Sequence, residues 1–319
     1  MTTSCRPLVI GDRSVMAATL KLLHSRLELR AVRSPAECQF SPGVIECLDL
    51  GNVDAAHLAK AAVSAEAGRA AYAYIETAVK LCQSRQIDGM VTAPVNKEAL
   101  AAAGVQHSGH TEILARLSGT ADFAMLLMGK ELKVIHVTTH VALRRVPDLV
   151  TRERVSKVIR LAQHTMQSLG HPRPKIAVCG LNPHAGEEGL FGDEEKTQII
   201  PAVEAARREG LDVYGPLAAD TLFSRARGGE FDIVVAMYHD QGHVPVKTVG
   251  FTYDEKAGTW TGLSGVNVTV GLPFLRVSVD HGTAFDRAWK GIANPESMVE
   301  ALDVAVRMLA AGRGARARK

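Results

Sequence analysis

The sequence predicts an α/β protein built around a mainly parallel sheet. Short apolar runs alternate with helical patterns, and this alternation is typical of β–α–β units. Polar loops rich in histidine follow several of the apolar runs, and open α/β sheets bind their ligands in the loops beyond the carboxyl ends of strands. No internal repeat is present. The expected strands are 7–12, 29–32, 44–48, 89–94, 133–139, 175–179, 211–214, 231–237 and 266–270.

Capping residues and breakers set the expected helices. Ser14, Asn96 and Thr151 each precede a helical pattern, and Gly68 is expected to break the long Ala-rich region 55–86. The stretch 251–264 is polar and interrupted by glycine, so it is expected to be a mobile loop or a short hairpin. The expected helices are 14–27, 55–86, one after 96, one from 108–112, 151–169, one from 192–195, 218–225, one from 284, and 295–310.

The composition excludes several classes of protein. The chain has 319 residues, 46% hydrophobic and 22% charged, as in an ordinary globular protein. A net charge of +3 is too small to indicate nucleic-acid binding, and the basic stretch 313–319 is expected to be a solvated, frayed end. There is no signal peptide and no apolar run long enough to cross a membrane. Five scattered cysteines without a C-x-x-C pair indicate reduced thiols and a cytoplasmic protein, and Cys179 is expected to be packed rather than nucleophilic.

The stretch 236–247, A-M-Y-H-D-Q-G-H-V-P-V-K, is the main candidate for chemistry. It follows the apolar run 231–237 and places His239, Asp240 and Lys247 within nine positions. His239 suits a metal ligand or a general base, and Lys247 suits an anion contact. A surface loop with incidental histidines is the alternative for this stretch taken alone.

Two further histidines favour the functional interpretation, because His140 and His184 also follow apolar runs. Three neutral imidazoles with an open position form a catalytic metal site, which polarises a substrate hydroxyl and stabilises an oxyanion. Their separations match no local ligand motif, so spacing alone does not identify a metal. His136 would share a strand face with His140 and is expected to be a core residue or a support for the ligand.

Anion-binding groups are the other candidates. His110 and Thr111 open a helix and add side-chain donors to its backbone N–H groups, although S-G-H-T also serves as a plain cap. Lys247, Asn267 and Arg276 together suit a phosphate or carboxylate pocket.

The chain resembles the 4-hydroxythreonine-4-phosphate dehydrogenase family of pyridoxal phosphate biosynthesis. The motifs T-A-P-V-N-K, G-H-T-E, T-T-H, G-L-N-P-H-A-G-E, M-Y-H-D-Q-G-H, G-V-N-V-T, G-L-P-F and D-H-G-T-A-F-D appear in the family's order and cover nearly the whole chain. Together they are highly specific.

This resemblance implies a fold similar to isocitrate and isopropylmalate dehydrogenases, with two α/β domains and a cleft between them. Residues 1–95 with 268–319 would bind NAD, and 96–267 would bind metal and substrate and form a homodimer. The absence of G-x-G-x-x-G after a strand agrees with a non-Rossmann NAD site. The implied NAD-binding residues are Asp280, His281, Gly282, Thr283, Ala284 and Asp286.

The resemblance also implies residue roles. His140, His184 and His239 would hold a divalent metal (Zn, Mg, Mn or Co), with ligands from both subunits. Asp240 and Lys247 are the catalytic candidates, and Asp240 or a metal-bound water would relay the proton. The substrate contacts would be His110, Thr111, Lys247, Asn267 and Arg276.

The implied reaction oxidises the C3 hydroxyl of a four-carbon, 4-phosphorylated acid with NAD+, and the β-keto acid then loses CO2. Within the family the sequence looks closest to the branch that converts D-threonate or D-erythronate 4-phosphate to dihydroxyacetone phosphate. Oxidation of 4-hydroxythreonine 4-phosphate is the alternative. Two other classes stay open: a dihydrodiol dehydrogenase on this scaffold, and an inactive sugar-phosphate-binding homologue.

Two departures from the family pattern are expected to matter. Family members begin with a strand and a G-D-P-A-G-I-G-P-E loop before the segment that matches 7–12, and this chain shows neither. Either its start codon is assigned too late, or the protein lacks this N-terminal strand and part of its cleft. We expect the 319-residue form to be less stable and less active than one with the segment restored. The stretch between Lys247 and Asn267 is longer than in the family. It would act either as a lid over the substrate or only as an extended loop.

Overall fold

The chain forms two compact α/β units. The computed structural model describes residues 5–106, 109–250, 252–255, 259–261 and 265–316. The first unit comprises the chain up to Ala121 with Leu272–Leu275 and Val279–Met298. The second comprises Asp122–Gly271 with Arg276–Ser278 and the chain from Val299. The mixed α/β class predicted from the alternation of strands and helices is confirmed.

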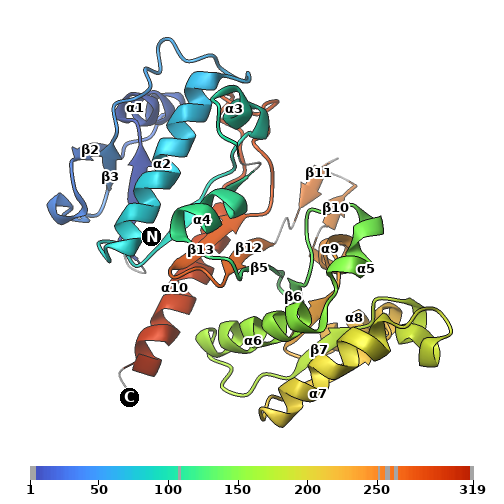
Figure 1. The fold of residues 1–319 in the computed structure, drawn as a ribbon. Coiled ribbons are helices and arrows are strands. Elements are labelled where there is room, and N and C mark those ends of the chain that lie inside the picture. Colours follow the sequence, from blue (N-terminus) through green and yellow to red (C-terminus); the bar gives the residue numbers. More distant parts are fainter. Residues whose placement is uncertain (1–4, 107–108, 251, 256–258, 262–264, 317–319) are drawn as a thin grey trace. The chain divides into compact units, whose positions relative to one another are not determined.

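The first unit contains a parallel sheet in the order β1-β3-β2, with α2 packed against it (Figure 1). Its core joins α2 to β4, α3 and α4 through buried residues such as Ile75, Met90, Leu100 and Ile113. The elements are β1 (Leu8–Gly11), α1 (Arg13–Leu22), β2 (Glu28–Val32), η1 (Pro35–Glu37), β3 (Val44–Asp49), α2 (Ala65–Gln83), β4 (Gly89–Thr92), α3 (Lys97–Ala102) and α4 (His110–Ser118).

Two expectations for this unit are corrected. Gly68 does not break α2, and the helix runs through it. A Cβ at this position would lie 2.0 Å from the carbonyl oxygen of Ala99 on α3. Glycine therefore allows the close approach of two helices. Ser14 lies inside α1 instead of capping it, and its hydroxyl holds the 53–55 loop by donating to Val53 O and accepting from Ala55 N.

The second unit is built on a mixed sheet. Its strands pair in the order β12-β5-β6-β9-β7-β8, antiparallel from β12 to β6 and parallel from β6 to β8. The elements are β5 (Ala124–Met128), β6 (Lys133–His136), η2 (Leu143–Arg145), α5 (Val146–Leu149), α6 (Arg152–Ser168), β7 (Ile176–Cys179), η3 (Pro183–Gly189), η4 (Glu195–Ile199), α7 (Ile200–Arg208), β8 (Val213–Leu217), α8 (Ala219–Arg227), β9 (Ile233–Ala236), α9 (His239–Gly250), β10 (Thr252–Asp254), β11 (Thr259–Thr261) and β12 (Val266–Val270). Residues of both units contribute to β13 (Leu275–Val279) and α10 (Glu296–Arg316).

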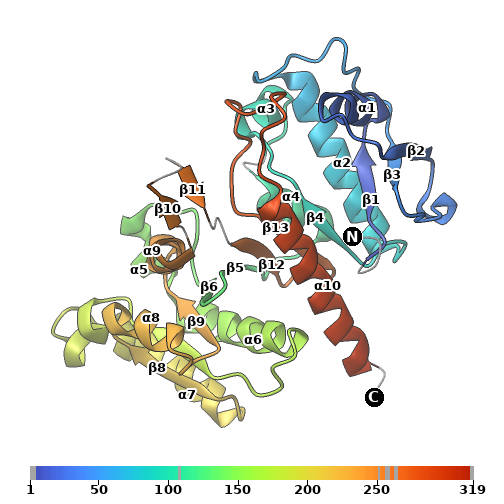
Figure 2. The same cartoon turned by 180° about the vertical axis from the view of Figure 1, so that it is seen from behind.

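Helices cover both faces of this sheet. Helices α6 and α7 lie on one face and α8 and α9 on the other (Figures 1 and 2). Alternate residues of the central strands, Val134 of β6 and Val234 and Ala236 of β9, pack with the buried side chains of α8 and α9. Cys179 belongs to the same core and is fully buried, as expected, and burial raises the pKa of its thiol. His136 has the parity of Val134 and so belongs to the α9 side of the sheet.

In the rest of the chain, several expected elements differ from those in the structure. Residues from His239 form a helix, α9, where a loop beyond the end of the strand was expected. Strands β5 and β13 were not expected, and the segment after Ala284 forms turns rather than a helix. The stretch 251–264 contains an antiparallel pair, β10 with β11, within its described part, in agreement with a short hairpin.

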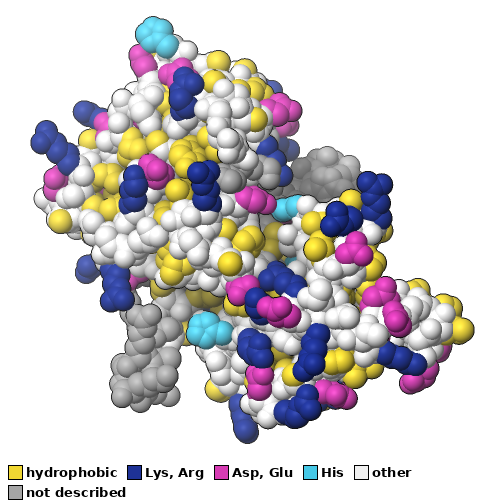
Figure 3. Space-filling view, viewed as in Figure 1, with side chains coloured by type: hydrophobic (Ala, Val, Ile, Leu, Met, Phe, Trp, Pro, Cys, Tyr) yellow, Lys and Arg dark blue, Asp and Glu magenta, His cyan; other side chains and the backbone are white. Residues whose placement is uncertain are grey.

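Figure 3 shows one face on which Lys and Arg side chains are interspersed with Asp and Glu. In the part of the chain that the structure describes, no helix combines the length and apolar character needed to cross a bilayer.

The packing of Gly68 gives a first testable prediction. Helix propensity alone would make Gly68→Ala stabilising by about 1 kcal/mol. Because the added methyl would meet the backbone of α3, we expect the opposite sign, a loss of about 1–3 kcal/mol typical of overpacking. Thermal melting of the variant measures it, and a higher melting temperature would contradict the close packing of α2 on α3.

Candidate functional site

The three candidate metal ligands follow three neighbouring parallel strands. In the register of the sheet, His136 pairs with Ala236, and Val178 pairs with Val235, so β9 lies between β6 and β7 with all three strands aligned. His140 follows β6, His239 begins α9 after β9, and His184 lies in η3 after β7. The carboxyl ends of parallel strands share one edge, which is where ligands bind in such sheets.

Two of these imidazoles lie close together. The ring centroids of His140 and His239 are 5.5 Å apart. Two imidazoles on one tetrahedral metal ion, with metal–nitrogen bonds of about 2 Å, have centroids roughly 5 Å apart, so this pair fits a shared metal. The ring of His184 lies against Phe191, with centroids 6.4 Å apart. Among the described residues no group of three or more His, Cys, Asp or Glu side chains forms a metal cluster within the single chain.

Asp240 controls the proton of His239. Its Oδ1 lies 2.7 Å from His239 Nδ1. A carboxylate accepts, so Nδ1 carries the hydrogen and Nε2 is left with a lone pair that could bind a metal, as in carboxylate–histidine–metal arrangements. The same hydrogen bond, with the nearby His239 and His243 imidazoles, lowers the pKa of Asp240 below its ordinary value.

Side chains tie the ends of the three strands together. Gln241 Oε1 accepts from Met237 N at 2.7 Å, and its Nε2 donates to Gly180 O at 2.8 Å. Thr138 Oγ1 donates to Met237 O at 2.8 Å. Gln241 therefore joins the start of α9 to the loop that leads to His184, and Thr138 joins the segment that leads to His140.

The loop that carries His184 is unusual in its backbone. Residues His184–Glu188 all have positive φ, four of them not glycine. Such left-handed conformations cost energy and persist only where the surroundings hold them.

The buried Glu195 carboxylate provides that support. Glu195 Oε1 accepts from Leu181 N at 2.7 Å and from Asn182 N at 2.8 Å, and Oε2 accepts from Asn182 Nδ2 at 2.9 Å. A Cβ at Gly186 would lie 2.7 Å from Glu195 Oε2, so the loop wraps closely around this carboxylate.

The predicted substrate contacts are divided between the units. Lys247 lies on α9, Asn267 on β12 and Arg276 on β13, all in the second unit. Arg276 is buried and donates from Nη1 to Thr269 Oγ1 at 3.0 Å. His110 and Thr111 begin α4 in the first unit, after Gly109, which supplies no side-chain cap.

The predicted NAD-binding residues form a loop in the first unit. The segment from Asp280 to Asp286 is partly exposed and not helical, and His281 Nδ1 donates to Gly282 O at 2.9 Å. The carboxylates of Asp280 and Asp286 reach solvent, and such carboxylates can accept hydrogen bonds from ribose hydroxyls.

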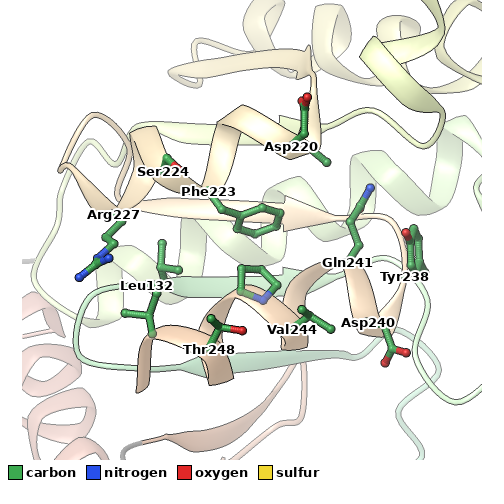
Figure 4. Close-up of a pocket in the computed structure, with 13 residues that line it drawn as sticks. Leu132, Asp220, Phe223, Ser224, Arg227, Tyr238, Asp240, Gln241, Val244 and Thr248 are labelled. Carbon is green, nitrogen blue, oxygen red and sulfur yellow. The ribbon is translucent and has the colours of Figure 1, made fainter. Parts of the chain in front are cut away.

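A pocket of about 580 Å³ opens between α8 and α9 (Figure 4). Asp240 and Gln241 lie at one end and Arg227 at the other, with Phe223 and Val244 between them. Neither His140 nor His184 lines it, so this pocket adjoins the histidine site without containing it.

Comparisons with known proteins identify the family. The family model described as pyridoxal phosphate biosynthetic protein PdxA matches residues 3–305. The chain belongs to the PdxA family. A D-threonate 4-phosphate dehydrogenase of Cupriavidus necator is 52% identical over 299 residues, 93% of this chain and 86% of that protein. One of Pectobacterium atrosepticum is 47% identical over 302 residues, 94% of this chain and 89% of that protein. The crystal structure of 4-hydroxythreonine-4-phosphate dehydrogenase from Klebsiella pneumoniae is 43% identical, with a TM-score of 0.83 over 97% of this chain and 94% of that one. The family predicted from the motifs is confirmed.

Sequence analysis of this PdxA family member missed the residues that hold the loops. Gln241 lies inside the M-Y-H-D-Q-G-H motif but has no charge or metal-binding group to single it out. Glu195 looked only like an acid that suits a helix start. A buried acid next to a Gly- and Pro-rich loop is the signal that would have identified it.

The support of the His184 loop can be tested at Glu195. Glu195→Ala leaves the part-buried N–H groups of Leu181 and Asn182 without their acceptor, and each such group costs about 1–3 kcal/mol. Asn182 Nδ2 keeps a second acceptor, Glu194 Oε2. We expect a loss of several kcal/mol in the free energy of unfolding, measured by chemical denaturation. Glu188→Ala is the matched control, since its side chain is 98% exposed and its ion pair with Lys196 is worth at most about 1 kcal/mol. Equal stability of the two variants would contradict this role.

Proposed function

We propose that this chain is a metal-dependent, NAD-linked dehydrogenase that oxidatively decarboxylates a four-carbon 4-phosphorylated hydroxy acid. We favour D-threonate or D-erythronate 4-phosphate as substrate, with dihydroxyacetone phosphate and CO2 as products. The observation that carries the proposal is the pairing of His140 with His239 at the shared edge of β6 and β9. It is supported by relatives named D-threonate 4-phosphate dehydrogenase, 52% and 47% identical to this chain.

The histidines provide the site for a divalent metal. His140 and His239 would hold the ion together with His184, whose place in the set is proposed across a homodimer. The metal would stabilise the negative charge that develops on substrate oxygen in both steps. Asp240 keeps the proton of His239 on Nδ1, and its carboxylate, with the pKa held low, is ionised at neutral pH and is the candidate to accept a proton from substrate.

Cationic and polar groups would bind the substrate's charges. Lys247, two turns beyond His239 on α9, and the buried Arg276 suit the phosphate and the carboxylate, with Asn267 on the neighbouring strand. His110 and Thr111 are proposed as further contacts, and the loop from Asp280 to Asp286 as the NAD site. We also propose that residues 1–95 with 268–319 form the NAD-binding domain and that residues 96–267 form the domain that binds metal and substrate. A cytoplasmic location is part of the same proposal.

A second candidate reaction is the oxidation of 4-hydroxythreonine 4-phosphate. The Klebsiella pneumoniae structure, 43% identical over 97% of this chain, carries that name. The two substrates differ by an amine or a hydroxyl at C2, and the proposed metal, phosphate and NAD contacts serve both.

The proposed function is tested by NADH formation with added Zn2+, Mg2+ or Mn2+. The three phosphorylated acids are offered in parallel. We expect turnover of D-threonate or D-erythronate 4-phosphate, loss of activity with a chelator, and at least a 1,000-fold loss in His239→Ala, because metal stabilisation is worth several kcal/mol. No turnover of any of the three by folded, metal-loaded protein would refute it, and exclusive turnover of the 4-hydroxythreonine compound would select the second candidate.

The phosphate contact is tested separately at Lys247. Lys247→Met should lower kcat/KM roughly 10–100-fold, because it removes a charged hydrogen bond to the phosphate worth about 1.5–3 kcal/mol. The loss should disappear with a substrate that lacks the 4-phosphate. Lys130→Met, an exposed lysine in the β5–β6 turn, is the control. An equal loss with the phosphate-free substrate would show that Lys247 does not bind the phosphate.

A further inference from the structure

Two buried histidines lie beneath the proposed metal ligand His239. His136 ends β6 and is fully buried, and His243 lies one turn after His239 on α9 with 5% of its surface exposed. The ring of His243 stacks on that of His239, with centroids 3.7 Å apart and planes 9° apart. The proposed function assigns neither buried histidine a role.

Hydrogen bonds fix the proton of His136. Its Nδ1 lies 3.1 Å from the carbonyl oxygen of Met125, which only accepts, so Nδ1 carries the hydrogen. Burial and the neighbouring imidazole of His243 lower the pKa of His136 to about 3, so the ring is neutral near neutral pH. The other nitrogen, Nε2, is therefore an acceptor.

The proton of His243 follows from that of His136. His243 Nδ1 lies 3.2 Å from His136 Nε2 and 3.1 Å from the carbonyl oxygen of His239. Both of these atoms accept, so Nδ1 of His243 carries a hydrogen and donates. The chain of bonds runs from His243 through His136 to Met125 on β5, and it fixes the plane of the His243 ring.

Close packing of α9 on β6 makes this contact possible. A Cβ at Gly242 would lie 2.5 Å from His136 Nε2 and 2.6 Å from a methyl carbon of Val134. Real Cβ atoms do not approach so closely, so only glycine at this position lets the helix reach His136.

We propose that His243, oriented by His136, is a positioning residue that sets the orientation of the His239 ring before the metal binds. The inference rests on the proposed function in taking His239 as a ligand. Asp240 holds one edge of the His239 ring through Nδ1, and His243 supports one face of it. A ring held in two directions presents Nε2 in a fixed orientation, and such supporting groups typically change metal affinity 10–100-fold.

The affinity for Co2+ alone, measured by competition with a coloured chelator, tests this without substrate or turnover. We expect His243→Leu to weaken Co2+ binding 10–100-fold. His243→Phe keeps a flat ring against His239 and should recover part of that loss. Val246→Ala is the matched control: it removes a buried side chain from the same helix and should lower the melting temperature without changing Co2+ affinity.

A double variant tests whether His136 acts through His243. His136→Leu alone should weaken Co2+ binding, because the His243 ring then keeps only its hydrogen bond to the carbonyl oxygen of His239. In the His243→Leu background it should cause no further weakening, whereas independent structural effects would multiply. Multiplying effects would overturn the proposal.

His239→Ala separates the two hypotheses. If it abolishes Co2+ binding while His243→Leu binds as tightly as Val246→Ala, His243 is only structural and this inference fails, although the proposed function stands. If His239→Ala binds Co2+ as tightly as the unchanged protein, His239 is not a metal ligand, and both the proposed function and this inference fail.

15N NMR of the metal-free protein, labelled with 15N-histidine, tests the proposal on the unchanged sequence and does not depend on whether a variant folds. Two-bond 1H–15N correlations distinguish the two imidazole tautomers. We expect both His136 and His243 to carry their hydrogen on Nδ1. A hydrogen on Nε2 of neutral His243 would break the chain of bonds and overturn the proposal.

Discussion

The parallel pairing of β9 between β6 and β7 is the constraint on which the candidate site depends. Each strand is apolar and buried, and its register is fixed by neighbours on both sides. Because side chains alternate between faces, a slip of one residue would turn every core residue of a strand to the wrong face. The register that buries the core therefore also brings His140 and His239 together. The segments that carry them are joined by the hydrogen bond from Thr138 to Met237, two residues 99 positions apart in the sequence.

Much of this arrangement was predictable from the sequence. Apolar runs located β6, β7 and β9, and the rule that ligands bind beyond strand ends selected His140, His184 and His239 from twelve histidines. The family motifs then supplied roles that no spacing rule gives. Helix α9 was missed because Gly242 and Pro245 weaken helix propensity, and tertiary packing on β5, β6 and β9 outweighs that local preference.

The missed residues share a physical reason. Gly68, Gly186 and Gly242 are needed because another atom occupies the space of a Cβ, and those atoms belong to segments distant in sequence, or to a side chain such as that of Glu195. Glu195 and Gln241 act by accepting from and donating to backbone groups of loops. One sequence shows which residues can make such bonds, but only the folded chain shows which unsatisfied backbone groups they meet.

The buried imidazoles show how such support is maintained at a cost. Moving polar rings out of water is unfavourable, and an apolar pair of similar shape would fill the space under His239 with no hydrogen bonds to satisfy. The pair is stable because each nitrogen that faces another group in the chain of bonds has a matching donor or acceptor. Removing His243 leaves the buried Nε2 of His136 without its donor, and removing His136 leaves His243 Nδ1 bonded only to the carbonyl oxygen of His239. The contributions of the two rings to stability are therefore coupled, and under the proposal above the orientation of His239 depends on both of them.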